Sequence, residues 1–416
     1  MWETIKNAWR VKELRQKILY TFGMLLLFRL VSVIPAPGVD LERVLGSTVD
    51  IPLLDLVNMM TGNAFSQMTI MAMGITPYIN SSIIMQLLCI AIPALERLQK
   101  EGAEGRKKIQ QITRYVTVGL AVVQAIGLVA GLGYIKSGWF NYVLVGVSMA
   151  GGTALAMWIG ERITEKGVGN GVSLLIFAGI ISNLFNGMVY SVNAAIAGTG
   201  NWLSVLGMVI ALLVLIVLVT FVDMGERRVP VQYAKRVVGR KMYGGQSTHI
   251  PMKVNSTGVL PLIFAYSFMA FPGTIIQLVA PSSGLATWWS VNMGSTSVLY
   301  NVITFLLIIA FTYFYTSISF NPVDMAKNIQ QQGGMIPGIR SGKNTVDYLS
   351  RTSRRLTLFG ALFLAFLASV PTLLTAGLNT SIPFAASSML IAVSVALETT
   401  RQLESQLVMR HYKGFL

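Results

Sequence analysis

Ten apolar runs divide the sequence, and each can cross a lipid bilayer as a helix. The runs cover residues 18–36, 74–93, 115–135, 142–160, 172–190, 202–222, 257–280, 298–320, 356–377 and 384–398. A transmembrane helix needs about 20 mostly apolar residues to cross the hydrocarbon core. The chain is 53% hydrophobic and 12% charged, whereas soluble domains carry about 25% charged residues. The sequence therefore predicts an all-α polytopic membrane protein with ten transmembrane helices.

Basic residues fall almost entirely in every second loop between these runs. Of the 32 Lys and Arg, 29 lie in the two tails and in the loops after the second, fourth, sixth and eighth runs. The opposite loops hold only Arg43 and Lys136. Because cytoplasmic loops are enriched in Lys and Arg, we expect both termini and the large loops at about 223–256 and 321–355 to be cytoplasmic. The net charge of +15 also predicts an anionic partner, such as lipid headgroups, nucleic acid or an acidic protein surface.

The ten spans divide into five and five, and the second span of each half opens with the same short pattern. Residues 74–79 read Gly-Ile-Thr-Pro-Tyr-Ile and residues 258–263 read Gly-Val-Leu-Pro-Leu-Ile, so both fit GxxPxI. This division predicts an N-terminal half over residues 1–200 and a C-terminal half over residues 201–416. Because five is an odd number, the second half would be inverted relative to the first, an arrangement that forms sites between the repeats. A chance match between two Gly- and Pro-bearing segments is the alternative.

One apolar stretch, residues 51–73, is interrupted too often to be a lipid-exposed span. Its polar and glycine residues include Asp55, Asn58, Thr61, Gly62, Asn63, Ser66 and Gln67. Irregular or half-helical backbone at membrane depth requires shelter inside the protein or beside a water-filled cavity. We therefore expect the spans to enclose a cavity that this stretch fills.

Ionisable and catalytic residues are scarce within the spans. Arg29 is the one cation well inside a run, and we interpret it as a structural residue that pairs with Asp40 or Asp55 or extends towards the headgroups. Both histidines, His249 and His411, lie in predicted cytoplasmic segments, and the sequence has no HExxH or P-loop motif. The sequence thus predicts no enzyme, no metal site and no cofactor. These features disfavour two alternatives, a secondary transporter for a small solute and an intramembrane hydrolase.

The second large loop carries a turn with a basic residue at its tip. Residues 333–340 read Gly-Gly-Met-Ile-Pro-Gly-Ile-Arg, and the closing Arg340 follows a Pro-Gly pair that favours a tight turn. A loop of this kind is typical of a docking surface. The alternative is that its basic residues only set the topology and contact anionic lipid headgroups.

Several motifs along the whole chain resemble those of the bacterial SecY family, which supplies the central subunit of the Sec protein-conducting channel. In chain order they are Phe28, Arg29, Ser32, Pro35, Pro37, Gly38 and Asp40; residues 74–79; Glu101, Gly102, Gly105 and Arg106; Tyr233, Ala234, Lys235 and Arg236; residues 246–251 and 253–255; Asn321 and Pro322; and Pro337, Gly338, Ile339 and Arg340.

The resemblance implies two five-helix halves that form a clamshell around an hourglass pore. At the waist it implies a ring of aliphatic side chains, the pore ring, formed by Ile75, Ile79, Ile176, Ile180, Ile263 and Ile391. An apolar constriction excludes ions by dewetting and offers no hydrogen bonds, so it passes many polypeptide sequences. The interrupted stretch then corresponds to a plug, a half-helix at about residues 53–67 that includes Leu53, Asn58, Met59, Gly62 and Phe65.

The resemblance also implies a lateral gate between the second and third spans on one side and the seventh and eighth on the other. The polar residues expected to join the gate helices through weak hydrogen bonds are Gln86, Gln124 and Ser267. Such a channel moves signal-bearing polypeptides across the membrane and releases hydrophobic segments into the lipid.

Partners are implied by the same resemblance. They are the small membrane subunits SecE and SecG, the SecA ATPase, the ribosome, signal sequences with the polypeptides they lead, and anionic lipids. The expected contacts for the motor and the ribosome are Arg240, Lys241 and Arg340, where basic side chains would meet acidic surfaces or RNA phosphates. The expected location is the bacterial inner membrane, with energy supplied by the bound partners.

Overall fold

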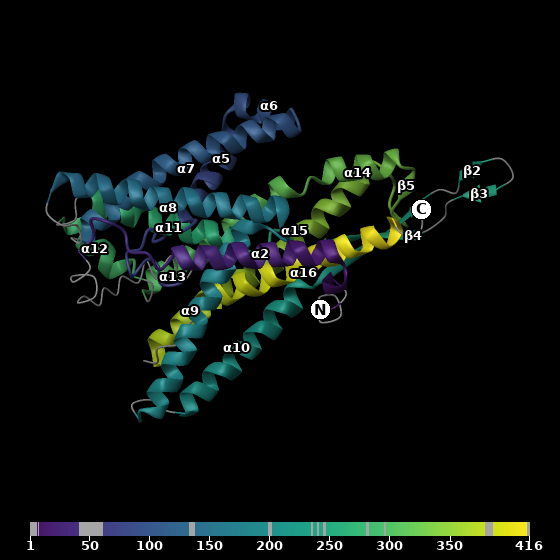
Figure 1. The fold of residues 1–416 in the computed structure, drawn as a ribbon. Helices are drawn as coiled ribbons and strands as arrows, with labels where there is room; N and C mark the ends of the chain where they lie inside the picture. Colours follow the sequence, from purple (N-terminus) through teal and green to yellow (C-terminus); the bar gives the residue numbers. More distant parts are fainter. Residues whose placement is uncertain are drawn as a thin grey trace.

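The computed structural model is built almost entirely of long helices (Figure 1). It describes residues 6, 8–40, 61–132, 138–198, 202–233, 236–238, 241–243, 247–279, 283–294, 297–378 and 386–413. The helices are α2 (Lys12–Val31), α5 (Thr76–Ala91), α6 (Pro93–Lys100), α7 (Ala103–Leu132), α8 (Trp139–Lys166), α9 (Gly171–Ile196), α10 (Trp202–Asp223), α11 (Leu260–Val279), α12 (Gly284–Asn292), α13 (Val298–Ser319), α14 (Pro322–Gln331), α15 (Lys343–Leu378) and α16 (Ala386–Lys413).

Each predicted membrane span corresponds mainly to one helix, and the predicted all-α polytopic architecture is confirmed. In the order of the apolar runs, these helices are α2, α5, α7, α8, α9, α10, α11, α13, α15 and α16. Within the described residues, length and hydropathy alone identify α8, α9, α10 and the α13–α14 pair as candidate spans, and the bent α5–α6 pair as a fifth if it counts as one broken span. Helices α7 and α15 begin well before their apolar runs, because the polar residues that precede each run continue the same helix.

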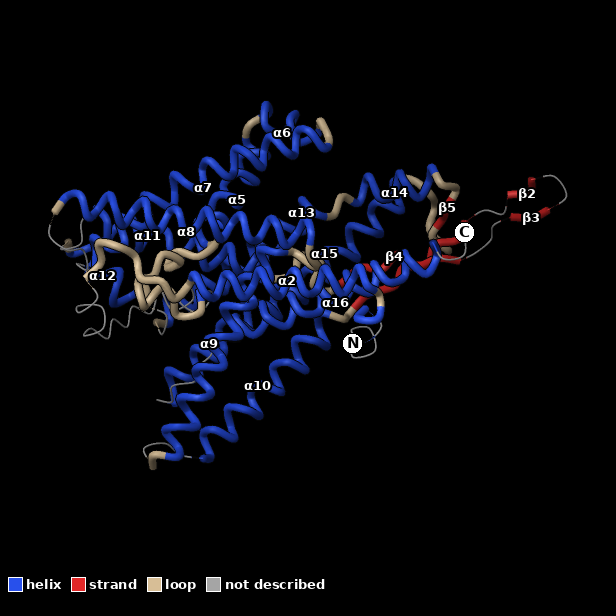
Figure 2. Tube along the Cα trace, viewed as in Figure 1, coloured by secondary structure: helices blue, strands red, loops and turns tan. Residues whose placement is uncertain are grey.

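Helices α5 and α6 form a sharply bent pair. The angle between them is 101°. The bend lies at Ile92, which has an extended backbone (φ −108°, ψ 113°) and precedes Pro93. A residue before proline is disfavoured in the helical region, so the apolar helix stops there. The short α6, which carries Glu96, Arg97 and Lys100, then turns away from the bundle (Figure 2).

The two GxxPxI segments have the same local backbone. Gly74 and Gly258 both adopt a left-handed conformation, with φ of +51° and +62°. The proline three positions after each glycine is the second residue of its helix, where a backbone amide has no partner inside the helix. The amides of Ile79 and Ile263 each donate to the carbonyl four residues earlier at 3.1 Å. The likeness of the two segments therefore extends from sequence to backbone geometry.

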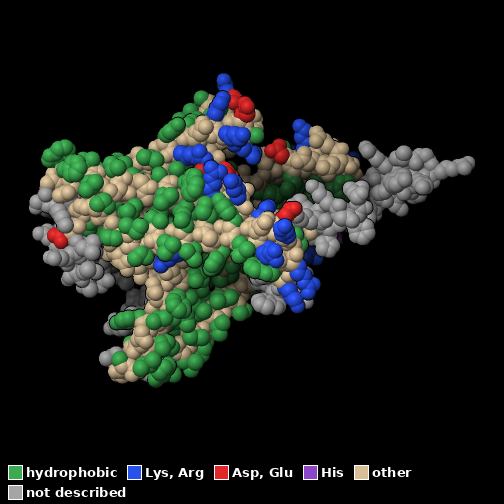
Figure 3. All heavy atoms as spheres, in the orientation of Figure 1, with side chains coloured by type: hydrophobic (Ala, Val, Ile, Leu, Met, Phe, Trp, Pro, Cys, Tyr) green, Lys and Arg blue, Asp and Glu red, His purple; other side chains and the backbone are tan. Residues whose placement is uncertain are grey.

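The helices form one elongated bundle, from which α9 and α10 lean away (Figure 1). Helix α13 packs against α15, α7 against α8, and α10 against α16. One buried hydrophobic cluster at the centre joins helices of both predicted halves. The visible flanks over α9 and α10 are mostly hydrophobic, whereas Lys and Arg gather towards the end where α6 and α14 lie (Figure 3). Apolar flanks with charge at one end are typical of a protein surrounded by lipid.

The two large basic loops, expected as separate loops, form one small sheet together. Strand β1 (Glu226–Tyr233) pairs antiparallel with β4 (Ser247–Lys253) on one edge and with β5 (Gly334–Met335) on the other. Strands β2 (Arg236–Val238) and β3 (Lys241–Tyr243) form a separate hairpin. Hydrophobic residues from both loops fill one core beneath the sheet, namely Val229, Val231, Met252, Ala326, Ile329, Ile336 and Leu349.

Candidate functional site

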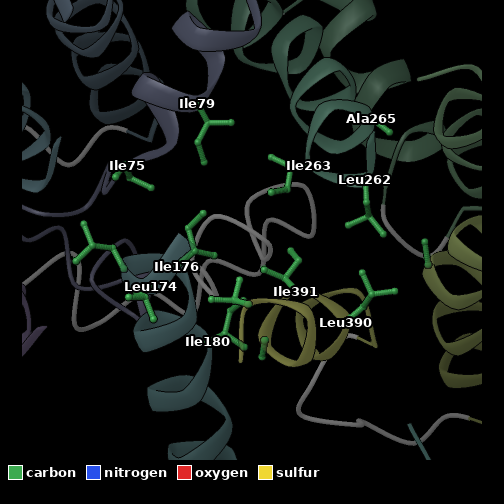
Figure 4. Packing of buried hydrophobic residues seen from close by; sticks show 14 of the residues in the cluster. Ile75, Ile79, Leu174, Ile176, Ile180, Leu262, Ile263, Ala265, Leu390 and Ile391 are labelled. Atoms are coloured by element: carbon green, nitrogen blue, oxygen red, sulfur yellow. The ribbon is translucent and has the colours of Figure 1, made fainter. Parts of the chain in front are cut away.

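Six isoleucines meet in the central cluster that joins the two predicted halves. Ile75 immediately precedes α5 and Ile79 lies in its first turn, while the other four lie on α9, α11 and α16. All six are buried, with exposed fractions from 1% for Ile391 to 8% for Ile79. Figure 4 shows their side chains arranged around a common centre. The structure thus brings together every residue of the predicted pore ring.

The side chains of this cluster are apolar and have no hydrogen-bonding groups. The spacing of four places Ile176 and Ile180 on the same face of α9, and both are buried at the centre. No isoleucine side chain can donate or accept a hydrogen bond, so the cluster has no preference for particular polar groups. Such an apolar constriction dewets and resists ions.

A cavity of about 1130 Å³ opens beside the pore ring, and we call this cavity the funnel. Ile79, Ile176 and Ile263 line it where it meets the ring. Its charged lining residues are Glu161, Glu165, Asp223, Lys253, Glu398 and Arg401. Along α16 the lining changes from apolar Val395 to charged Glu398 within one turn. The funnel is therefore lined by charged residues in one part and by isoleucines of the central cluster in another.

The described part of the predicted plug is a buried, turn-rich segment. Gly62 and Phe65 belong to it, whereas the following predicted plug residues lie outside the described part of the chain: Leu53, Asn58 and Met59. The Phe65 side chain packs in a buried cluster with residues of α7 and α8. The amide of Ala36 donates to the Met68 carbonyl at 3.0 Å and holds the end of the segment. Most of residues 61–73 are thus buried inside the protein, whereas Ser66 and Gln67, two of the polar residues that interrupt the stretch, are exposed.

Arg29, the cation inside the first span, contacts this segment. Its Nη2 donates to Oγ of Ser182 on α9 at 2.6 Å, and its Nη1 donates to the Gly62 carbonyl oxygen at 3.4 Å. Between the described residues there is no ion pair from Arg29 to Asp40, and Asp55 lies outside them. Where a carboxylate was expected, the described part of the chain supplies two neutral oxygen atoms.

One polar contact joins the two predicted halves at the expected lateral gate. The hydroxyl of Tyr315 on α13 donates to Oε1 of Gln86 on α5 at 3.0 Å. Gln124 on α7 and Ser267 on α11 are half-buried on helices that pack together, but within the described residues neither makes a hydrogen bond. Sequence reasoning missed Tyr315, because its hydroxyl is one of several in an aromatic-rich span and its partner is 229 positions away.

The predicted docking residues are described only in part. Arg340 is exposed at the end of its turn, where Gly338 has φ of +79° and the Thr345 hydroxyl donates to the Arg340 carbonyl at 3.2 Å. Lys241 is the first residue of β3, and Arg240 lies outside the described residues. The turn presents Arg340 to solvent on a fixed backbone.

Comparison with known proteins gives a family. The SecY family model matches residues 69–400. The protein translocase subunit SecY of Streptomyces scabiei is 44% identical over 435 residues, which cover 99% of this chain and 98% of the relative. The corresponding subunit of Halalkalibacterium halodurans is 44% identical over 430 residues, covering 100% of both chains.

Solved structures share the fold at lower sequence identity. A structure described as that of a protein-conducting channel has a TM-score of 0.68 at 20% identity, covering 94% of this chain and 91% of the other. The channel in the canine ribosome-channel complex from the endoplasmic reticulum has a TM-score of 0.66 at 18% identity, with the same coverage. With its family match and its near-full-length relatives, the chain belongs to the SecY family of protein translocase subunits.

Proposed function

We propose that the pore ring is the constriction through which this chain passes signal-bearing polypeptides across the membrane. As a member of the SecY family, the protein is a multi-pass membrane protein and a protein-conducting channel. The observation that carries the proposal is the convergence of six buried isoleucines, three of which line the funnel. An apolar ring fits closely around chains of varied sequence and still resists ions.

The division into two halves, residues 1–200 and 201–416, gives the ring a means of opening. Ile75, Ile79, Ile176 and Ile180 come from the first half, and Ile263 and Ile391 come from the second. The matching backbone at Gly74 and Gly258 supports an internal repeat. In this proposal the halves separate like a clamshell and widen the ring without breaking any hydrogen bond within it.

Lateral release of hydrophobic segments would occur between α5 and α7 on one side and α11 and α13 on the other. The contact that supports this proposal is the Tyr315–Gln86 hydrogen bond, which crosses from one side to the other. A single bond of this kind is weak, on the order of 1 kcal/mol. An incoming apolar signal helix supplies more than that by packing against the gate helices.

Energy and targeting would come from partners, and we expect no catalytic activity from this chain. The proposed partners are SecE and SecG in the membrane, SecA and the ribosome at the basic loops, and anionic lipids at the headgroup level. The canine structure with the same fold is part of a ribosome-channel complex, which supports a ribosome contact here. The proposed location is the bacterial inner membrane with both termini cytoplasmic, as the 29 basic residues on one side predict.

Reconstitution tests this function directly. The chain is placed in vesicles with SecE and SecG, SecA and ATP are added outside, and protease protection of a signal-bearing precursor is measured. We expect protection with the intact signal sequence and none for the same precursor without its signal. Absence of protection with correctly oriented protein would refute the channel function. Ion flux stimulated by a small solute, without precursor transport, would instead favour the secondary transporter, which no comparison supports.

A further inference from the structure

Arg29 joins three segments that are distant in the sequence. Its guanidinium group donates from Nη2 to Ser182 Oγ at 2.6 Å and from Nη1 to the Gly62 carbonyl oxygen at 3.4 Å. Arg29 lies in the last turn of α2, Ser182 lies on α9, and Gly62 lies in the described part of the plug. One side chain therefore holds the segment at residues 61–62 against two helices of the bundle.

The backbone at Gly62 leaves no room for a side chain beside Arg29. Gly62 has φ of +65°, a conformation that favours glycine. A Cβ atom there would collide with Nη1 of Arg29 and lie 3.2 Å from the carbonyl oxygen of Gly179 on α9. Gly62 thus fits between the guanidinium group and the α9 backbone, and no other residue type fits without displacement.

The same segment contacts the start of α5. A Cβ atom on Gly74, which has φ of +51°, would lie 2.7 Å from Cγ2 of Thr61. Gly74 immediately precedes Ile75 of the pore ring, and Gly179 immediately precedes Ile180. Two glycines next to ring residues therefore provide the space in which Thr61 and Gly62 sit.

The partners of Arg29 suit a contact that must break and form again. A hydrogen bond from a charged donor to a neutral oxygen is stronger than a bond between two neutral groups. Within the described residues, the contact of Arg29 lacks the charge pairing that makes a buried Arg–carboxylate pair costly to separate. Ser182 lies two residues after Ile180 on the same rigid helix, so displacement of Ile180 also displaces the hydroxyl that holds the guanidinium group.

We propose that Arg29 is a positioning residue that latches the plug segment to α9 in the resting channel. In this latch, Ser182 is the partner on α9 that moves when the pore ring is displaced. The proposal rests on the channel function described above and assigns a role to the one basic residue inside the first span. A polypeptide that pushes Ile176 and Ile180 outwards draws Ser182 away from Arg29, and the hold on Gly62 weakens as a result. The latch thereby couples occupation of the ring to release of the plug.

Conductance of the resting channel tests the latch. In planar bilayers without precursor, Arg29→Gln is expected to raise the resting conductance about tenfold, because a hydrogen bond to a charged group is lost. Ser182→Ala should give a smaller, several-fold rise, and Arg29→Lys should fall between the wild type and Arg29→Gln. The matched control is Ser191→Ala on α9, whose hydroxyl, among the described residues, donates only to the Gly187 carbonyl of its own helix at 2.9 Å.

Export of a precursor with a weakened signal sequence is the second readout, and it should improve in the same order. A residue with a merely structural role would lower the yield of folded protein without raising conductance or relaxing signal selection. If Arg29→Gln does not fold, Ser182→Ala decides the question alone. Wild-type conductance and wild-type signal selection in folded Ser182→Ala would overturn the latch. Failure of the wild-type chain to export any precursor would instead overturn the channel function.

Discussion

The hydroxyl of Tyr315 donates a hydrogen bond to Oε1 of Gln86 across 3.0 Å, and this bond ties α13 to α5. The ring of Tyr315 also meets the ring of Phe264 on α11 edge-on, with centroids 5.3 Å apart. The hydroxyl therefore bridges the proposed gate while the ring packs on one side of it. Removing the hydroxyl and keeping the ring separates these two roles.

Tyr315→Phe is expected to ease export of precursors with shortened signal sequences. The lost interhelical hydrogen bond of about 1 kcal/mol corresponds to about a fivefold shift towards the open gate. Protease protection of such a precursor in reconstituted vesicles measures the change. Tyr313→Phe is the matched control, since Tyr313 lies on the same helix and makes no hydrogen bond within the described residues. Equal export by the two variants would show that the Tyr315 hydroxyl does not help to hold the gate closed.

Ile391→Asn is expected to make the translocating channel leak ions several-fold more than the wild type. Ile391 is buried in the pore ring, and an amide there holds water in a constriction that otherwise dewets. Conductance is recorded while a precursor occupies the pore. Ile391→Leu keeps the volume and the apolar character, so it should conduct as the wild type does. If Ile391→Asn conducts ions no more than the wild type does, residues other than the pore ring form the seal.

Deletion of residues from Asn58 to Phe65 is expected to leave the channel assembled and to raise its resting ion leak. The deletion removes Gly62 and Phe65, whose surroundings are buried contacts of the bundle. It should also relax the choice of signal sequence, because less contact has to be broken before opening. Recordings from the intact and the shortened chain in the same bilayer compare the two. Identical resting conductance would contradict a plugging role for this segment.

Arg340→Glu is expected to abolish export driven by SecA while the protein stays folded. The side chain is exposed, and its backbone is held by the Thr345 hydroxyl, so charge reversal changes the surface and not the turn. ATP-dependent protease protection measures the loss. Lys343→Glu, another exposed basic residue three positions away, is the matched control and should retain most activity. Full activity of Arg340→Glu would favour the alternative that these charges only set topology.

The membrane-spanning architecture could be predicted because it depends on local composition. A run such as residues 202–222 has almost no polar residue, and α10 occupies it from Trp202 to Asp223. The interrupted stretch could also be predicted, since frequent polar residues forbid exposure to lipid wherever the chain goes. By contrast, the six isoleucines are ordinary residues in their spans, and only resemblance to a family singled them out.

Contacts between distant segments could not be predicted from the residues. Ser182 is 153 positions from Arg29, and nothing in its own span marks it as a partner.

The sheet formed by the two large loops was missed for a different reason. The alternation of Val229 and Val231 with polar neighbours in β1 is a strand signal, but the run is short and lies among basic residues that suggested a loop.

The core shared by the two large basic loops has a mechanical consequence. Leu349 is fully buried in that core and belongs to α15, the 36-residue helix that continues into the bundle. Strand β1 follows α10 directly, and β4 leads into α11. The two loops therefore form one packed unit that is connected directly to three helices, α10, α11 and α15. A force applied at either loop would therefore act on α10, α11 and α15 together, because all three continue from the shared core.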